Sequence, residues 1–263
     1  MENTHKRLEA LLQAMPPISL AEMSEIRLMK RTDQKYLTNI ETLAELLRLT
    51  RDDYYAQEID GRRINPYATT YWDDESEAFF HFHQAGHRPR RKVRVRTYVG
   101  SGQSFLEVKR KDNHGKTFKS RVTVPSLEAV MNDRAGQDFL QEKTGFDFSQ
   151  LRPTVANRFY RITLVNRGKT ERLTIDFDIR FRNLKTGREA AMDHIVVIEL
   201  KRDGRVHSPI LPLLRQLRIK PAGFSKYCIG ACVTDDTLRV NRFKKRLIRI
   251  RKVANKPVPT AAG

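Results

Sequence analysis

The sequence predicts an α+β protein whose main element is a closed, mostly antiparallel eight-stranded β-tunnel with flanking helices. Three features support this: strands with one charged face, turn residues between consecutive strands, and a strongly basic composition. Alternate residues of a strand face the same side of its sheet, so Arg94-Val95-Arg96 has one apolar and one ionic face. A charged face repeated on many strands is costly unless it lines something wet and anionic. A barrel with an ionic interior and helices on its apolar outside meets both requirements.

The elements follow from the hydrophobic periodicity of the chain. A helix is expected over residues 4–14 and a second over 40–49, with the first strand, around 31–37, between them. Further strand-like runs follow at 68–72, 91–99, 104–109, 117–124, 154–165, 172–181 and 192–201. Helices are also expected at 126–132, 137–143, 210–217, 225–233 and in the basic tail, which comprises residues 238–252.

Four short segments contain the residues that tight turns prefer, and each lies between two strand-like runs. They are residues 100–102, 113–115, 166–168 and 185–187. Hairpins at these places predict a mostly antiparallel sheet within one domain, residues 1–237. A second segment, residues 238–263, should consist of a basic helix and a disordered end.

The composition favours anionic partners. The chain has 50 Lys and Arg residues against 31 Asp and Glu residues, a net charge of +19 and a pI near 10.2. Such a balance suits nucleotides, nucleic acid, polyphosphate or anionic lipid. In the basic tail, Val240, Phe243, Leu247 and Ile250 recur at helical spacing. This pattern fits a helix packed on the barrel, a membrane-surface helix or an RNA-binding arm, and packing is favoured.

Two cysteines, Cys228 and Cys232, are too few for a disulfide framework, and a metal-type cluster does not accompany them. A reducing, cytoplasmic setting is therefore expected. Residues 1–15 lack an apolar signal-peptide region, and no later stretch approaches about 20 apolar residues. Neither export nor a membrane span is expected, and association with a membrane or a membrane protein is left open.

Nine short motifs occur in an order and approximate spacing known from one domain. They are Arg31-x-Asp33-x-Lys35-Tyr36, Tyr71-Trp72-Asp73-Asp74, Arg94-x-Arg96-x-Tyr98, Glu107-x-Lys109, Lys119-x-Arg121, Pro153 followed by Tyr160-Arg161, Arg172-x-Thr174-x-Asp176, Glu199-x-Lys201 and Phe224-Ser225-Lys226-Tyr227. Their order over about residues 25–233 resembles the VTC polyphosphate polymerase domain, the catalytic part of the vacuolar transporter chaperone. That domain is one of the triphosphate tunnel metalloenzymes. No single motif is specific, but nine in order are hard to produce by chance.

The resemblance implies a role for each matching residue. The basic residues that grip the nucleotide and the growing chain fall on Lys35, Arg94, Arg96, Lys109, Arg161, Arg172 and Lys226. Further substrate contacts fall on Arg31, Lys119 or Arg121, Lys201 and Ser225. The metal-associated glutamate falls on Glu199, and Glu107 is a second candidate. The implied activity is transfer of the γ-phosphoryl group of ATP onto polyphosphate, with Mn²⁺ or Mg²⁺ required and no specific nucleic-acid ligand.

The residue types suit this chemistry independently. Phosphoryl transfer requires that donor and acceptor are held in line and that charge on the phosphate oxygens is neutralised. Arg94 and Arg96 project from one strand about 7 Å apart, at ~3.3 Å per residue, which spans neighbouring phosphates. Ser225 stands where a helix should begin, so it is a candidate N-cap, and the helix end should attract a phosphate oxygen.

Several residues have a structural alternative. Glu107 and Glu199 are candidates for ion pairs with neighbouring lysines, and Asp176 and Asp178 for salt bridges or further metal ligands. His81, His83 and His87 are expected in a loop or strand edge, as surface or phosphate-contacting groups.

Two other functions stay open. The first is a tunnel hydrolase; the related CYTH enzymes begin with an E-x-E-x-K strand, whereas this chain reads Arg31-x-Asp33-x-Lys35. The second is a non-catalytic module that binds polyanions or nucleic acid, for which the net charge would suffice. Such a binder gains nothing from carboxylates on the ionic strands, so the polymerase is favoured.

Overall fold

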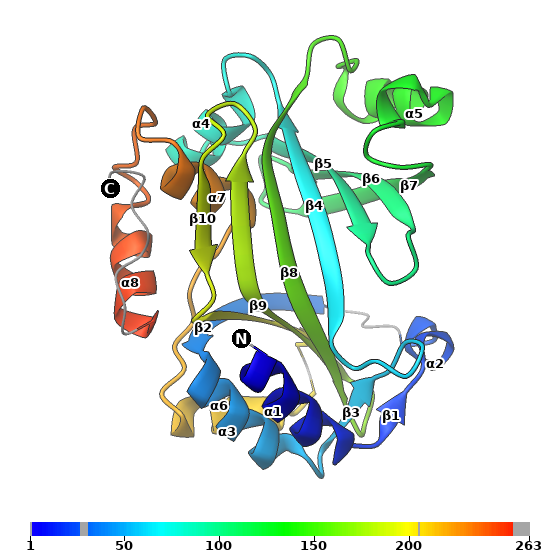
Figure 1. Cartoon of the computed structure of the whole chain (residues 1–263), viewed down its shortest axis with the longest axis vertical. Coiled ribbons are helices and arrows are strands. Elements are labelled where there is room, and N and C mark those ends of the chain that lie inside the picture. The colour runs from blue at the N-terminus through cyan, green and yellow to red at the C-terminus, as the bar shows by residue number, and fades with distance from the viewer. Residues whose placement is uncertain (1, 27–30, 205, 255–263) are drawn as a thin grey trace.

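The structure is a computed structural model that describes residues 2–26, 31–204 and 206–254. Its main element is a sheet of eight strands in the order β2-β11-β9-β8-β4-β5-β6-β7, with antiparallel neighbours throughout (Figure 1). These strands are β2 (Arg31–Asn39), β4 (Asn65–Asp73), β5 (Arg90–Tyr98), β6 (Ser104–Lys111), β7 (Thr117–Val124), β8 (Arg152–Asn166), β9 (Glu171–Asn183) and β11 (Ile195–Asp203). Three short strands lie at its margins: β1 (Pro17–Ile18), β3 (Tyr54–Gln57) and β10 (Glu189–Met192).

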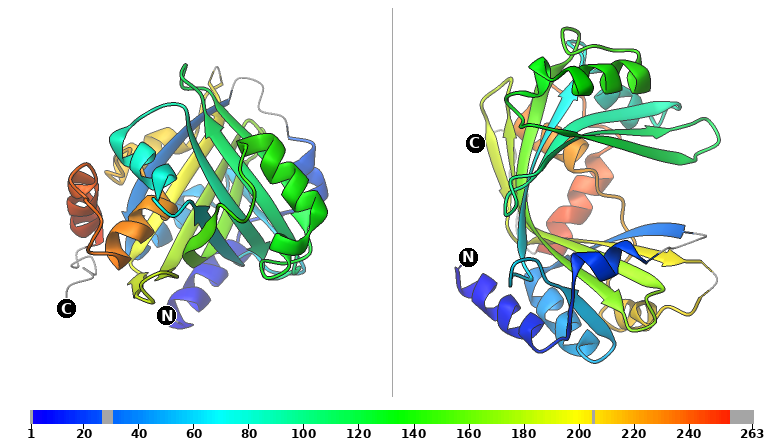
Figure 2. Two further views of the ribbon diagram at one scale, coloured as in Figure 1. Left: turned by 90° about the horizontal axis from the view of Figure 1, so that it is seen from above. Right: turned by 90° about the vertical axis from the view of Figure 1, so that its right-hand side faces the viewer.

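The sheet is strongly curled but open. No ladder joins the end strands β2 and β7 within the described residues. Figure 2 shows the resulting half-barrel, whose inner surface we call the concave face. The predicted α+β class and eight antiparallel strands are confirmed, whereas the predicted closure is not seen in this part of the chain. Both edges carry basic side chains, Lys35 on β2 and Lys119 on β7. Each of these lysines is paired with a carboxylate, Lys35 with Glu199 and Lys119 with Glu107, and charged residues discourage edge strands from pairing.

Helices cover the convex face of the sheet in two groups. One group is α1 (Glu2–Gln13), α3 (Ile40–Thr50) and α6 (Ile210–Gln216), and the other is the 3₁₀ turn η1 (Val130–Asn132) with α5 (Arg134–Thr144). Under the first group, Ile175 and Ile198 join a large buried core. Under the second, Val95 and Leu106 pack with Leu140 of α5. The apolar residues that alternate with the charged ones are therefore buried, as the strand pattern predicts.

Three helices gather at one end of the sheet: α4 (Ala78–Ala85), α7 (Lys226–Thr234) and α8 (Lys244–Ala254). α7 lies against the sheet so closely that a Cβ at Gly230 would stand 2.6 Å from Phe181 and 2.9 Å from Val155. Glycine is needed there because no larger residue fits. α8 packs near β2 and β11 and buries Ile250, and Phe243, just before this helix, is buried as well. The packing interpretation of the basic tail is thus confirmed.

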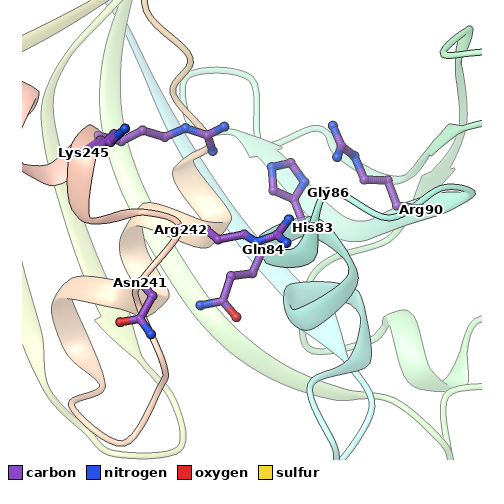
Figure 3. Close-up of a pocket in the computed structure, with 8 residues that line it drawn as sticks. His83, Gln84, Gly86, Arg90, Asn241, Arg242 and Lys245 are labelled. Carbon is purple, nitrogen blue, oxygen red and sulfur yellow. The ribbon is translucent and has the colours of Figure 1, made fainter.

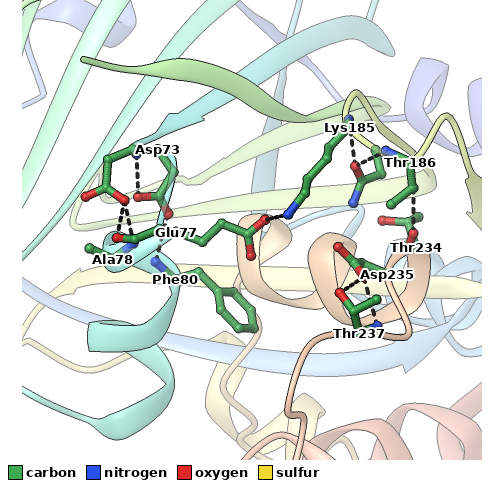
Figure 4. A network of polar contacts seen from close by, with 12 residues as sticks. Asp73, Glu77, Ala78, Phe80, Lys185, Thr186, Thr234, Asp235 and Thr237 are labelled. Atoms are coloured by element: carbon green, nitrogen blue, oxygen red, sulfur yellow. Dashed lines mark hydrogen bonds and ion pairs between the residues drawn. The ribbon is translucent and has the colours of Figure 1, made fainter.

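A buried carboxylate joins the start of α4 to α7. Asp73 accepts a 2.9 Å hydrogen bond from the backbone N–H of Phe80 (Figure 4). It accepts another from the hydroxyl of Tyr227. It thereby supplies the capping contact that a helix start requires. Burial raises the pKa of Asp73 to about 6, although its hydrogen bonds oppose the rise. At the end of α7, Thr186 donates a 3.0 Å hydrogen bond to the carbonyl of Thr234.

Some local predictions were wrong. His81 and His83 lie on α4, where a loop or strand edge was expected, because Asp73 caps this helix from the preceding strand. Of residues 126–132, only the last three form a helical turn. β1, β3 and the short helix α2 (Leu20–Ser24) were not predicted. The expected disordered end, 255–263, lies outside the described residues. Among the residues that are described, no helix is both long and apolar enough to cross a membrane.

Candidate functional site

A row of basic side chains on β5 occupies the concave face. It consists of Arg90, Lys92, Arg94 and Arg96. The intervening Val93 and Val95 are buried in the core under α5, so the basic row points to the opposite side. The register places Glu107 of β6 opposite Arg94 and Lys109 opposite Lys92. On β7, Arg121 stands opposite Glu107, and Lys119 opposite Lys109.

The other half of the concave face comes from β2, β11, β9 and β8. Ladder partners on this face are Lys35 with Glu199, Lys201 with Arg172, and Arg161 with Asp176. The two halves face one another across the hollow, since Lys109 of β6 interacts electrostatically with Lys35 and Glu199. The sheet therefore brings predicted site residues that are distant in sequence into one basic hollow.

Glu107 is enclosed by cations. Its carboxylate accepts a 2.6 Å hydrogen bond from Arg94 Nε, and it forms an ion pair with Lys119. Burial alone would raise the pKa of Glu107, but Arg94, Arg96 and Lys119 outweigh burial and lower it to about 2. The side chain is 1% exposed. Glu107 therefore fixes the positions of Arg94 and Lys119.

Asp176 holds two of the predicted catalytic cations. Arg161 binds it through two atoms, with Nε 2.6 Å from Oδ1 and Nη2 2.8 Å from Oδ2. Lys226 of α7 forms an ion pair with the same carboxylate. Burial would raise the pKa of Asp176, but the two cations hold it well below its usual range. The structural salt bridge, which the sequence left as an alternative for Asp176, is therefore present.

Glu199 also lies between two cations, but it is more accessible. Lys35 forms an ion pair with its Oε1, and Lys201 Nζ lies 3.4 Å from Oε2. Burial would raise the pKa of Glu199, but Lys201 and Lys35 hold it well below its usual range. The Glu199 side chain is 19% exposed. An ionised and partly exposed carboxylate is available for a further cation.

Two predicted catalytic cations have no carboxylate at ion-pair distance within the described ranges. Arg96 is 7% exposed, and its Nε lies 3.3 Å from the hydroxyl of Thr69. Burial and the neighbouring Arg94 lower the pKa of Arg96 to about 10. Lys109 projects into the hollow, where desolvation lowers its pKa to about 8. These side chains carry positive charge that an anionic ligand can neutralise.

The start of α7 closes this site. Ser225 is its N-cap, as predicted, and its side chain accepts a hydrogen bond from the backbone N–H of Cys228 at 3.3 Å. Lys92 donates a 2.7 Å hydrogen bond to the same hydroxyl. The helix start thereby adds its partial positive charge beside Lys92 and Lys226. Sequence reasoning missed Lys92, although its two-residue spacing from Arg94 was a usable signal.

The remaining predicted site residues take less part in the ion pairs of the concave face. Arg121 lies over the ring of Phe105, 4.7 Å from its centroid. Arg172 donates a 3.1 Å hydrogen bond to the carbonyl of Met23, which ties α2 to β9. The backbone of Arg31 begins β2, but its side chain lies outside the description. Sequence reasoning also gave no role to Tyr67. The centroid of its ring lies 5.0 Å from Arg161 Cζ and 5.8 Å from Arg96 Cζ.

The predicted metal ligands differ in how well they fit a divalent ion. Within residues 2–26, 31–204 and 206–254, no three His, Cys, Asp or Glu side chains are grouped to hold a metal. Mg²⁺ usually binds one or two carboxylates together with phosphates of the substrate. Glu199 fits that pattern, because it is ionised and partly exposed. Glu107 fits a charge-pairing role better. Both metal assignments remain predictions.

The chain is similar to known proteins over the whole of its main sheet. Residues 30–234 match the family model described as the VTC domain. No curated protein matches. One similar solved structure is a putative adenylate cyclase from Bacillus halodurans, with 14% sequence identity and a TM-score of 0.48 over 82% of this chain and 99% of that chain. Another is a putative adenylate cyclase from Vibrio parahaemolyticus, with 11% identity and a TM-score of 0.45 over 78% of this chain and 100% of that chain. A third is a putative adenylyl cyclase from Hippeastrum, for which a dominant triphosphatase activity is described. It has 11% identity and a TM-score of 0.45 over 77% of this chain and 95% of that chain. Because the family match spans all eight strands of the main sheet, the chain belongs to the VTC domain family.

Proposed function

We propose that this chain is a metal-dependent polyphosphate polymerase, which transfers the γ-phosphoryl group of ATP onto a growing phosphate chain. The charge balance of the concave face carries the proposal. Glu107, Asp176 and Glu199 are each held by two cations. Arg96 and Lys109 remain without a carboxylate partner in the described part of the chain. Such an excess suits two polyanions, a donor and an acceptor, in one site.

In the proposed reaction, an oxygen of the terminal phosphate of the chain attacks the γ-phosphorus of ATP. The bond from that phosphorus to the β–γ bridging oxygen breaks, and ADP leaves. The protein has to hold both partners in line and neutralise the phosphate oxygens. Arg161 keeps its Nη1 outside both bonds to Asp176, so this nitrogen is available for a phosphate. We assign the same task to Lys35, Arg94, Arg96, Lys109, Arg172 and Lys226.

A divalent metal, Mn²⁺ or Mg²⁺, supplies further neutralisation of phosphate charge when it is bound. We assign Glu199 to hold it together with oxygens of the nucleotide. Lys35 and Lys201 keep Glu199 ionised, so the ligand needs no deprotonation step at neutral pH. Glu199→Gln should raise the metal concentration needed for activity or abolish turnover, with the fold retained.

The proposal is tested by incubation with ATP and Mn²⁺ followed by phosphorus NMR. We expect the internal-phosphate resonance of a long chain to grow together with ADP. Where circular dichroism shows that the variant is folded, Arg94→Ala combined with Arg96→Ala should lower this rate by orders of magnitude, because two charged hydrogen bonds of roughly 1.5–3 kcal/mol each are lost. The matched control, Arg110→Ala with Lys116→Ala, removes two charges outside the concave face and should leave the rate unchanged.

Other product patterns identify the alternatives. Orthophosphate as the sole product under every metal tested would replace the polymerase with a tunnel-type triphosphatase. ATP binding without turnover would indicate a non-catalytic polyanion-binding module. Arg31 stands where the hydrolase pattern has a carboxylate, so Arg31→Glu should shift the products toward orthophosphate. A cytoplasmic location and a membrane partner for the product remain predictions.

A further inference from the structure

A separate cavity lies between α4, the start of β5 and the basic tail. Its volume is about 380 Å³, which is large enough for a small polyanion. Its lining includes His83 and Gln84 of α4, Arg90 of β5, and Arg242, Lys245 and Arg246 of the basic tail (Figure 3). None of its lining residues is acidic.

The cavity gathers positive charge without an internal counterion. Arg90, Arg242, Lys245 and Arg246 form no ion pair with any described carboxylate. Desolvation lowers the pKa of Arg90, and the nearby Arg246 lowers it further. Arg242, Lys245 and Arg246 are exposed, so solvent screens part of their mutual repulsion, but an anion bound among all four cations should still be stabilised.

His83 gives a second indication that the cavity takes a ligand. Its Nδ1 is buried and has no hydrogen-bond partner. Burial, together with the positive charges of Lys92, Arg90, Arg246 and Lys109, lowers the pKa of His83 to about 2. The imidazole is therefore neutral at physiological pH and can donate one N–H to an anion. The charges that act on His83 come from both the cavity, through Arg90 and Arg246, and the concave face, through Lys92 and Lys109.

We propose that this cavity is a second oligophosphate-binding site. Arg90 is the last member of the β5 row, which extends about 20 Å from Arg96 at ~3.3 Å per residue. The cavity prolongs this row beyond the sheet. Arg242, Lys245 and Arg246 follow the last residue matched by the family model, so the site depends on this chain's own tail. The occupant is either the far part of a chain already on the concave face or a separate short oligophosphate.

The test uses calorimetric titration of the full chain with tripolyphosphate. Lys245→Gln with Arg246→Gln removes two cavity charges, while Arg242 is kept because it donates a hydrogen bond to the Ala85 carbonyl and holds the basic tail on α4. The matched control, Lys244→Gln with Lys252→Gln, removes two charges from the same helix outside the cavity. Wild type and control should show two binding stages. The cavity variant should lose one stage or weaken it about tenfold or more.

Equal titrations for the cavity variant and the control, with unchanged circular dichroism, would overturn the proposal. A converse variant, Arg96→Gln with Lys109→Gln, should lose the other stage and keep the cavity stage. Because no turnover is measured, a protein that binds two tripolyphosphates but forms no polymer keeps this inference and loses the polymerase.

Long polyphosphate distinguishes the two sources of the ligand. If the chain extends from the concave face into the cavity, the cavity variant should bind long polyphosphate more weakly than the control does. If the cavity takes a separate oligophosphate, long-chain affinity should match the control while the tripolyphosphate stage is still lost.

Discussion

Two arginines on the same face of β5 differ in their ion pairing, although both lower the pKa of Glu107. The register places Glu107 opposite Arg94, and Arg94 Nε donates to it at 2.6 Å. Arg96 stands opposite Phe105, and its Nε lies 3.3 Å from the Thr69 hydroxyl, with no carboxylate at ion-pair distance among the described residues. Arg94 therefore stabilises the fold, whereas Arg96 has a desolvation cost that an anionic ligand can offset.

This contrast predicts that replacing Arg96 mainly weakens triphosphate binding, whereas replacing Arg94 mainly lowers the stability of the fold. Arg96→Gln should leave the melting temperature unchanged or raise it, while triphosphate affinity falls roughly tenfold to hundredfold through loss of a charged hydrogen bond. Arg94→Gln should instead destabilise the protein by about 3–5 kcal/mol, because a buried ion pair is broken. Thermal unfolding and triphosphate titration of both variants check this. A larger loss of stability for Arg96→Gln than for Arg94→Gln would contradict the assignment.

The depressed pKa of Lys109 predicts a pH dependence. Its pKa of about 8 lies below the ordinary 10.5, so the side chain loses its charge as pH rises through 8. Tripolyphosphate affinity should fall roughly tenfold between pH 7 and 9. Over the same rise the unliganded protein should gain stability, because the folded state releases this proton before the unfolded state does.

Arginine remains protonated at pH 9, which supplies the control. Burial also lowers the pKa of Lys119, on the same face, to about 8, so Lys109→Arg should reduce the pH dependence of tripolyphosphate binding, and Lys109→Arg with Lys119→Arg should flatten it. Lys116→Arg, in the β6–β7 hairpin, should leave it as in the wild type. Equal slopes for Lys109→Arg and Lys116→Arg would show that another group titrates.

At the scale of elements, α8 is part of the packed protein and also one wall of the basic cavity. Phe243, just before α8, is 1% exposed and stacks on Phe80 of α4 at 6.1 Å between ring centroids. Phe243→Ala should therefore lower the free energy of unfolding by about 3–5 kcal/mol. Ile248 is 41% exposed, and Ile248→Ala should change that free energy by no more than about 0.5 kcal/mol. Chemical denaturation measures both.

Truncation after Asp236 should also destabilise the protein, because the basic tail is part of the packed core. It removes the buried Phe243 and Ile250 together with the charges of the basic tail. The shortened protein should unfold at a lower temperature, and its ATP chemistry should persist only where it remains folded. An undiminished melting temperature would mean that α8 does not pack as the structure describes.

For the whole molecule, the sequence could predict the sheet because charges and apolar residues alternate on most strands. Alternation does not reveal closure, since open and closed sheets share the two-residue period. It also does not reveal the register between strands. The register decides that Arg94 stands opposite a carboxylate, Glu107, whereas Arg96 stands opposite Phe105. α4 was missed because Asp73, seven residues before Phe80, caps it from another element. The cavity was missed because its walls come from α4, β5 and the basic tail, whose proximity only the folded chain shows.

The open order of the sheet has a mechanical consequence. Backbone hydrogen bonds do not fix the distance between β2 and β7 in the described residues, so packing and the repulsion between cations of the two halves, such as Lys35 and Lys109, set the curvature. A polyanion bound between Lys35 and Lys109 would offset that repulsion and draw the two halves together. We therefore expect small-angle scattering to give a smaller radius of gyration with tripolyphosphate than with orthophosphate at equal ionic strength. The curvature of this sheet then becomes a measure of the charge it holds.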